Sequence, residues 1–265
     1  MKLGRREFNF VAAALVGLVI AAPAMADVLD TIMSTKKIRV ATDMGIPPYG
    51  MLDGSMQPTG SDVAVAKLLA ADWGVELEFV NTTGPTRIPN INTDKADVVI
   101  SSLSVTEERK KAVDFTRPYS FIRTTVIAPT EDTAKEWTDL SGKAIAVVRS
   151  TTQDIALTEM APEFGFNVVR YDDDATAITA AISGQAIYLG LADPQMRAIN
   201  ERSTAKQFEA KIVINQFPIA MAVKQGETRL AEKLNEWIAE NAANGKLNEA
   251  YKAYHDLDIP AEILN

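Results

Sequence analysis

The feature that most constrains the fold is a regular alternation of strand-like and helix-like segments. Residues 37–41 and 75–80 have the short, apolar or alternating pattern of strands, and residues 62–73 between them place apolar side chains on one helical face. A third compact apolar strand is predicted at residues 96–100. A β-α-β order favours a parallel sheet with helices on its faces, because a parallel connection needs a crossover.

The same order restarts near residue 130. The expected elements are strands at 142–148, 167–171 and 187–192, with helices that begin near 152 and span 175–182. Asp174, at the start of the last helix, has the residue type of an N-cap. The second half of the chain is therefore predicted to repeat the architecture of the first.

After this second unit the chain is predicted to return to the first. Residues 219–223 resemble one more strand, and two helices follow, the second over 246–254. In the first of these helices one face is apolar, with Leu230, Leu234, Trp237 and Ile238. We therefore expect an α/β protein with two doubly wound lobes joined by a hinge, lobe 1 being 27–129 plus 219–265 and lobe 2 being 130–218.

Composition removes most familiar enzyme chemistry. The 265 residues include no cysteine, which excludes disulfides and thiolate metal centres. His255 is the only histidine, so Ser-His-Asp triads and histidine-rich metal sites are hard to build. His255 itself is expected to be solvated. A formal charge of −8 opposes binding to the phosphates of a nucleic acid. We expect no catalytic residue, no metal and no cofactor.

Residues 1–26 have the pattern of a cleaved export signal. A positively charged start precedes an apolar stretch from 10 to 22, and small residues precede Asp27. A membrane anchor is the alternative, but this stretch is shorter than the roughly 20 residues that a spanning helix needs. We expect a periplasmic protein, exported by the general secretory or the twin-arginine pathway.

Polar residues gather where predicted strands end and helices begin. Ser102 and Ser104 directly follow the strand at 96–100, and Thr106 is a good N-cap that puts Arg109 in the first helical turn. A helix N-terminus offers unpaired N–H groups and a positive dipole end, so these residues form a carboxylate-sized anion site. The alternative is that Arg109 belongs to a solvated, charged helix face.

The second half repeats this arrangement. Thr151 and Thr152 lie between a strand and its helix, where simple N-capping is the alternative to ligand binding. Asp193 ends the strand at 187–192, and strand carboxyl ends are where open α/β sheets bind ligands. A carboxylate on Arg109 and an ammonium on Asp193 would suit a zwitterion. The alternative for Asp193 is a helix cap.

Three further features have weaker patterns. Arg87 lies at a helix start and is either an anion contact or exposed, and Tyr49 either stacks on a ligand or packs in the core. The run 172–174 of three aspartates lacks the glycine and glutamate of a calcium loop and is interpreted as a solvated cap.

At these residues the sequence resembles the family-3 extracytoplasmic solute-binding proteins, the polar amino-acid binding subunits of ABC importers, from about residue 36 to 260. The most specific block is KADVVISSLSVTEERKKAVDFTRPY at 95–119, supported by GSDV at 60–63, DLSGKAIAVVRSTT at 139–152 and AANGKL at 242–247. The resemblance implies a two-lobed fold like that of periplasmic binding proteins, which closes on a small ligand.

The resemblance also implies residue roles. Arg109 would hold the ligand α-carboxylate, helped by Ser104 and Thr152, and Ser102 and Asp193 would receive the α-ammonium. Arg87 lies in a stretch similar to that of members that take acidic amino acids, and would face a side-chain carboxylate. The expected ligand-binding set is completed by residues within or near these blocks, namely Tyr49, Leu103 and Thr151.

The resulting hypothesis is a monomeric binding protein that captures a polar amino acid, with acidic amino acids among the candidates, and presents it to a membrane permease. An enzyme similar to cyclohexadienyl dehydratases is an alternative on the same fold, although no residue pair forms an evident acid–base couple. A sensory ligand-binding module is a third reading, and the sequence does not separate it from transport.

Overall fold

The computed structural model describes residues 27–264, so the predicted signal at 1–26 lies outside the described residues. The main sheet contains, in chain order, β1 (Lys37–Thr42), β4 (Glu76–Asn81), β5 (Val98–Val99), β6 (Val113–Pro129), β7 (Ala144–Val148), β8 (Asn167–Tyr171), β9 (Tyr188–Ala192) and β10 (Phe208–Lys224). A separate hairpin pairs β2 (Met51–Leu52) with β3 (Pro58–Thr59).

Helices surround both ends of this sheet. They are α1 (Val28–Thr35), α2 (Ser61–Trp73), α3 (Arg87–Asn92), α4 (Glu107–Lys110), α5 (Thr152–Phe164), α6 (Asp174–Ile182), α7 (Asp193–Arg202), α8 (Thr228–Ala243), α9 (Lys246–His255) and α10 (Ala261–Leu264), with a 3₁₀ turn at Trp137–Leu140. None of the helices within 27–264 has the length and apolar character needed to cross a membrane.

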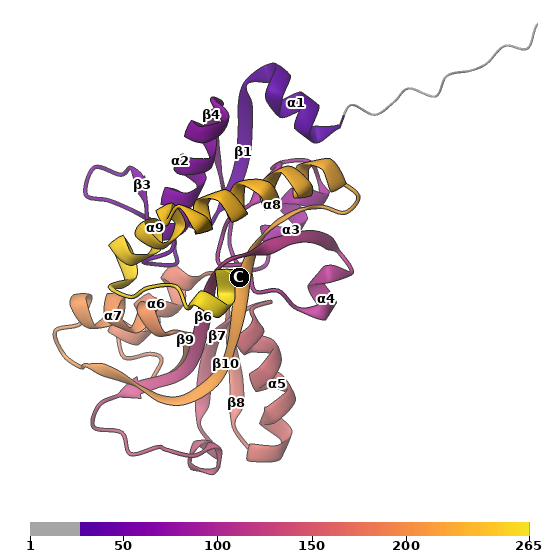
Figure 1. Cartoon of the computed structure of the whole chain (residues 1–265). Helices are drawn as coiled ribbons and strands as arrows, with labels where there is room; N and C mark the ends of the chain where they lie inside the picture. The colour runs from indigo at the N-terminus through magenta and orange to yellow at the C-terminus, as the bar shows by residue number, and fades with distance from the viewer. Residues whose placement is uncertain (1–26, 265) are drawn as a thin grey trace, which may run out of the picture.

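The strand order is β4-β1-β5-β10-β6-β9-β7-β8, which divides the sheet into two halves. We call the half with β4, β1 and β5 lobe 1, and the half with β9, β7 and β8 lobe 2. In Figure 1 lobe 1 lies at the top with α2, α8 and α9, and lobe 2 lies below with α5, α6 and α7. The predicted two-lobed α/β fold is confirmed.

Two long strands connect the lobes. β6 and β10 pair antiparallel along most of their length and run through the middle of the molecule (Figure 1). The strand predicted at residues 219–223 is only the last part of β10, and β6 was not predicted at all. The division after residues 129 and 218 remains a prediction, because both strands belong to each lobe over part of their length.

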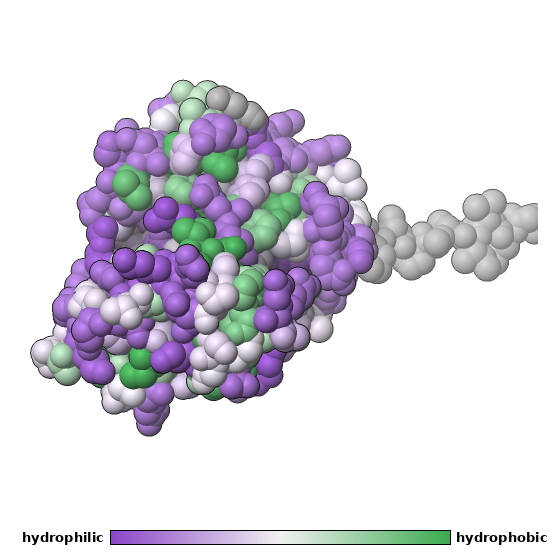
Figure 2. All heavy atoms as spheres, turned by 90° about the horizontal axis from the view of Figure 1, so that it is seen from below, coloured by the Kyte–Doolittle hydropathy of each residue, from purple (hydrophilic) through white to green (hydrophobic). Residues whose placement is uncertain are grey.

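Each lobe has its own core. In lobe 1 the predicted apolar face of α8, including Leu234 and Ile238, packs with Val40 and Leu69. In lobe 2 one cluster contains Val148, Ile178 and Leu191, and another contains Val147 and Leu157. Seen from below, the outer surface is mostly hydrophilic, with hydrophobic residues gathered in a few areas (Figure 2).

The pairing within each lobe determines where the site forms. β1 is parallel to β4 and β5, and β7 is parallel to β8 and β9, as the β-α-β order predicted. Because parallel strands end at the same edge of a sheet, the loops after β1, β5, β7 and β9 gather between the lobes.

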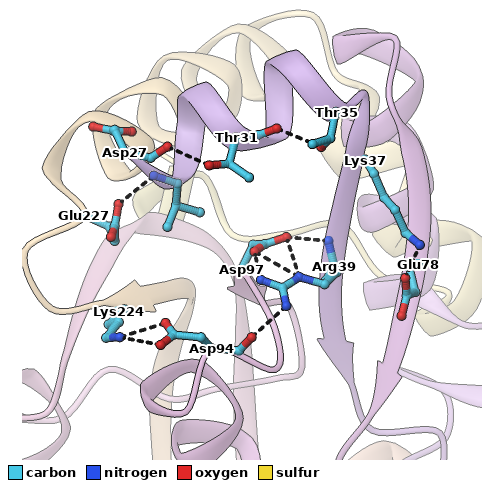
Figure 3. Close-up of polar contacts among 11 residues, drawn as sticks. Asp27, Thr31, Thr35, Lys37, Arg39, Glu78, Asp94, Asp97, Lys224 and Glu227 are labelled. Carbon is cyan, nitrogen blue, oxygen red and sulfur yellow. Dashed lines mark hydrogen bonds and ion pairs between the residues drawn. The ribbon is translucent and has the colours of Figure 1, made fainter. Parts of the chain in front are cut away.

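Polar contacts join the strands of lobe 1 near the edge of the sheet that faces away from lobe 2 (Figure 3). The carboxylate of Asp97 accepts hydrogen bonds from the backbone N of Arg39 at 2.7 Å and from its Nε and Nη2, while Arg39 Nη1 donates to the carbonyl of Asp94 at 2.6 Å. Lys224, at the end of β10, pairs with the Asp94 carboxylate. These contacts hold β1, β10 and the turn before β5 together.

One predicted cap is wrong by a residue. Asp173, not Asp174, is the N-cap of α6, and its side chain accepts from the backbone N of Thr176 at 2.7 Å. Asp174 is buried and accepts a hydrogen bond from Gln195 Nε2. Adjacent aspartates are equally good caps by residue type, and the backbone path decides which of them lies outside the helix.

Candidate functional site

Arg109 lies where the two lobes meet. Thr106 caps α4 as predicted, accepting from the backbone N of Arg109, and so directs the arginine toward the strand ends. Its guanidinium donates to the carbonyl of Ser104 at 2.9 Å and, across the lobe boundary, to the carbonyl of Ser150 at 3.1 Å. The alternative of a solvated helix face is therefore wrong for Arg109, which is only 9% exposed.

The charge of Arg109 is not neutralised by the protein. Among residues 27–264 no carboxylate lies within ion-pair distance of it. Burial lowers the pKa of Arg109 to about 9, and the nearby charge of Arg87 adds to the effect. A buried cation without a partner is costly, so this position favours an anionic group.

Arg87 is the second buried arginine of the site. Its side chain is 5% exposed and donates from Nη1 to the carbonyl of Ser101 at 2.9 Å, while its Nε has no partner. Arg87 also lies near lobe 2. A Cβ atom added at Gly84 would be 3.5 Å from Arg87 Nη2 and 3.0 Å from the carbonyl oxygen of Arg149, so both groups lie close to this glycine. The exposed alternative for Arg87 is wrong.

Ser102 is held in an unusual backbone conformation beside a buried carboxylate. Its φ is +42°, and its N–H donates to Asp62 Oδ2 at 2.7 Å. Tyr119 donates to the other oxygen of Asp62, also at 2.7 Å. Burial raises the pKa of Asp62 to about 7, against the opposing effect of these hydrogen bonds. The hydroxyl of Ser102 is buried and has no hydrogen-bond partner within the described residues.

Lobe 2 contributes the N-terminus of α5. Thr151 is its N-cap, accepting from the backbone N of Asp154 and donating to the carbonyl of Val148 at 2.7 Å. Thr152, 7% exposed, contacts the side chain of Gln153. Thr151 therefore has the capping role that the sequence left open as the alternative to ligand binding.

Asp193 and Tyr49 line a groove beside α7 and α9. Arg123 Nε and Thr125 Oγ1 both donate to the Asp193 carboxylate, the latter at 2.9 Å. Tyr49 is 1% exposed and packs at 4.7 Å against the ring of His255. Both line a groove of about 690 Å³ between α7 and the end of α9, whose lining includes neither Arg87 nor Arg109.

Two other sequence predictions concern core positions. Leu103 is fully buried in lobe 1, and its carbonyl accepts from the backbone N of Ala220 on β10. His255 was predicted to be solvated, which is wrong: it is 3% exposed, stacks on Tyr251 at 3.9 Å and shares a hydrogen bond with Ser61 Oγ. Helix α9, which carries His255, packs against α2.

Sequence reasoning missed the carboxylates of the site. Asp43, Asp62 and Asp174 are all buried, and burial raises the pKa of each more than the charge of Arg87 lowers it. Asp62 lies in the GSDV block, which was noted only as a family pattern, and Asp174 was interpreted as a solvated cap. Within 27–264 no cluster of three acidic or histidine side chains is arranged to hold a metal ion.

Comparisons with known proteins agree with this architecture. The family described as "bacterial extracellular solute-binding proteins, family 3" matches residues 38–256 of this chain. The ABC transporter glutamine-binding protein GlnH of Bacillus subtilis is 30% identical, covering 89% of this chain and 87% of its own. The L-arginine-binding protein of Pseudomonas aeruginosa is 28% identical, covering 87% and 92%.

A solved structure shows the same fold. The ancestral amino acid-binding protein AncCDT-1, described as a precursor of cyclohexadienyl dehydratase, superimposes with a TM-score of 0.75 at 30% identity, covering 86% of this chain and 99% of its own. The family match covers most of the described chain, and the chain has a two-lobed fold with buried arginines at the lobe boundary. The chain belongs to the bacterial extracellular solute-binding proteins of family 3.

Proposed function

We propose that the protein captures an amino acid between its lobes outside the cytoplasm and presents it to the permease of an ABC importer. The observation that carries this proposal is Arg109, a buried guanidinium with no carboxylate partner among residues 27–264. Related chains that bind glutamine and L-arginine support an amino acid as the ligand.

The α-carboxylate of the ligand is proposed to bind Arg109. A guanidinium holds a carboxylate through two parallel hydrogen bonds, and the contact is strongest where water is excluded. The N–H groups at the start of α5, including that of Thr152, would complete the carboxylate site from lobe 2. Because these groups come from both lobes, the ligand binds best when the lobes are closed.

The α-ammonium is proposed to bind near Ser102. The unpartnered hydroxyl of Ser102 supports this role. The role predicted for Asp193 requires that the ammonium replace the guanidinium of Arg123, which already pairs with the Asp193 carboxylate. Ser102 is therefore the better supported of the two contacts.

An enzyme on this fold is the second candidate. The likeness to AncCDT-1 favours it, as does Asp62, whose pKa burial raises to about 7, where a carboxyl can donate or accept a proton. Both oxygens of Asp62 accept hydrogen bonds from within the protein, which opposes a catalytic role. Incubation with prephenate or arogenate, followed by detection of an aromatic product, separates the two functions.

The proposal is tested by a thermal-shift panel of all amino acids on the chain from Asp27, unfolded and refolded beforehand to remove bound ligand. A ligand at about 100 times its Kd stabilises by roughly 2.7 kcal/mol, a shift of a few degrees. Arg109→Ala is expected to fold and to lose this shift. Arg229→Ala, which removes an exposed arginine paired with Asp27 and Asp30, is the matched control and should retain it.

Retention of the full ligand-induced shift by Arg109→Ala would contradict the carboxylate site. A wild-type protein that responds to no amino acid, but converts prephenate or arogenate, would move the enzyme to first place.

A further inference from the structure

Two serines beside the buried arginines have a left-handed backbone conformation, which residues other than glycine rarely adopt. Ser102, shortly after β5, has a φ of +42°, and Ser150, shortly after β7, has a φ of +63°. Such strain persists only where the surrounding structure imposes it, and it is typical of functional sites. Elsewhere in 27–264, positive φ in residues other than glycine is confined to helix ends and turns, at Lys36, Met56, Asp94 and Asp256.

In lobe 2 the residue that holds Ser150 is Asp154, in the first turn of α5. Asp154 Oδ2 accepts a hydrogen bond from the backbone N of Ser150 at 2.9 Å, and Oδ1 accepts from Arg170 Nε at 2.8 Å. The Asp154 side chain is only 9% exposed. Because Arg170 lies on β8, in register with Val147 of β7, the carboxylate is anchored to the sheet as well as to its own helix.

The conformation of Ser150 determines where its backbone carbonyl points. The side chain of Ser150 is exposed, whereas its carbonyl accepts from Arg109 Nη2 at 3.1 Å across the lobe boundary. A change of Ser150 to an ordinary negative φ would redirect this carbonyl and move the start of α5 relative to Arg109. The left-handed turn is therefore what brings the N-terminus of α5 and the arginine together.

Lobe 1 contains the same arrangement. Asp62, in the first turn of α2, accepts from the backbone N of Ser102 at 2.7 Å, and the carbonyl of Ser102 accepts from Arg87 Nη1 at 3.4 Å. In each lobe, a buried carboxylate in the first turn of a helix holds a left-handed serine whose carbonyl accepts from a buried arginine. This recurrence at two separate strand ends connects the strain to the site.

We propose that Asp154 is a positioning residue, which holds Ser150 in the left-handed conformation and so aligns the start of α5 with Arg109 for an amino-acid carboxylate. This inference rests on the proposed function, since it assumes that an amino acid binds at Arg109. Asp154 acts through Ser150 and not on the amino acid itself. Because every amino acid has an α-carboxylate, loss of this alignment weakens all of them by a similar factor and keeps their order of affinity.

Two substitutions at Ser150 test the conformation and leave Asp154 in place. Calorimetric titration of the refolded 27–265 chain with each of the twenty standard amino acids gives the Kd values. Ser150→Val opposes a positive φ because valine is β-branched, whereas Ser150→Gly adopts it without strain. We expect Ser150→Val to bind about tenfold more weakly than Ser150→Gly, the effect of losing about one hydrogen bond to a charged group.

Asp154→Ala tests the residue that holds the turn. It is expected to raise every measurable Kd by about tenfold. Combining it with Ser150→Gly should restore part of the lost affinity, because glycine needs no carboxylate to favour the left-handed conformation. A role of Asp154 in stability alone would not be rescued by that second substitution.

Asp97→Ala is the matched control for Asp154→Ala. The Asp97 side chain is 7% exposed and, like that of Asp154, accepts from one backbone N–H group and from an arginine side chain, both of Arg39 in this case. It lies at the edge of lobe 1 that faces away from lobe 2. Asp97→Ala should lower the Tm and leave every Kd unchanged.

The outcomes that overturn the inference differ from those that overturn the proposed function. Equal Kd values for Ser150→Val and Ser150→Gly, or an unchanged Kd in Asp154→Ala, overturn the positioning role while the wild type still binds. A loss of affinity in Asp97→Ala as large as in Asp154→Ala does the same, because general destabilisation then explains both. If Asp154→Ala does not fold, the comparison at Ser150 decides. Absence of binding of every amino acid by the wild type overturns the proposed function and the positioning role together.

Discussion

His255 shows how burial changes a single residue. Its ring stacks on Tyr251, lies 4.7 Å from the ring of Tyr49 and has a buried Nδ1 without a partner. Burial lowers the pKa of His255 to about 4, and the charge of Arg197 contributes to the same shift. The neutral ring is therefore the folded form throughout the physiological range.

The lowered pKa of His255 makes the stability of the folded protein depend on pH, and its direction fixes the sign of the effect. Between pH about 6.5 and about 4 the unfolded chain binds a proton at His255 and the folded chain does not, so this residue makes stability fall as the pH falls. His255→Gln should remove the effect, so the Tm of the variant relative to wild type should rise as the pH falls from 7 to 5.

Nuclear magnetic resonance checks the cause directly, because the chain has one histidine. Its ring signal should titrate with a midpoint near 4 in the folded protein. A midpoint near 6.5, the ordinary value for histidine, would show that the ring is solvated and would remove the predicted difference between wild type and variant.

At the scale of elements, the short strands and their helices were predictable because each has a strong local pattern. Residues 37–41, 75–80 and 167–171 all fall within one residue of β1, β4 and β8. The long strand β6 was not predictable in this way, because Arg117, Pro118 and Arg123 interrupt its apolar pattern. Its register with β10 contains several irregularities, so its extent depends on pairing with a distant segment.

The junction of β1, β5 and β10 gives a stability prediction. Asp97, whose side chain is 7% exposed, bonds both the backbone and the guanidinium of Arg39. Asp97→Ala should destabilise the protein by about 1–3 kcal/mol, because it removes the acceptor of the partly buried backbone and side-chain N–H groups of Arg39. Lys37→Ala, which breaks the exposed pair with Glu78 in the same region, should destabilise the protein much less, because solvent screens an exposed ion pair.

Urea unfolding of the two variants measures both values, and the contrast is the test. Equal destabilisation by Asp97→Ala and Lys37→Ala would show that the Arg39 contacts are no stronger than an exposed ion pair.

At the scale of the whole molecule, the lobes contact each other in the structure. Arg109 reaches Ser150, and Arg197 of α7 pairs with Asp256 at the end of α9. This arrangement buries Arg87 and Arg109 without an ion-pair partner among residues 27–264. Closure in the absence of an anion is therefore costly, and an open form should be favoured until a ligand binds.

Small-angle X-ray scattering tests this coupling. The ligand-free wild type should have a larger radius of gyration than the amino-acid complex, since ligand binding favours the closed form. Arg109→Ala should give the same radius with and without the amino acid. An identical radius for free and bound wild type would indicate that the lobes stay closed and that Arg109 does not control closure.

Local sequence patterns determined the two-lobed α/β class, most strand and helix positions, and the first turn of α4 with Arg109, because periodicity and capping act over a few neighbouring residues. Tertiary structure decided which charges are buried together. Asp62 and Asp174 are buried by segments far along the chain, since Asp62 accepts hydrogen bonds from Ser102 and Tyr119 and Asp174 accepts one from Gln195. It likewise decided that Asp193 pairs with Arg123 and that His255 lies in the core, since burial and charge pairing depend on contacts between segments far apart in the chain.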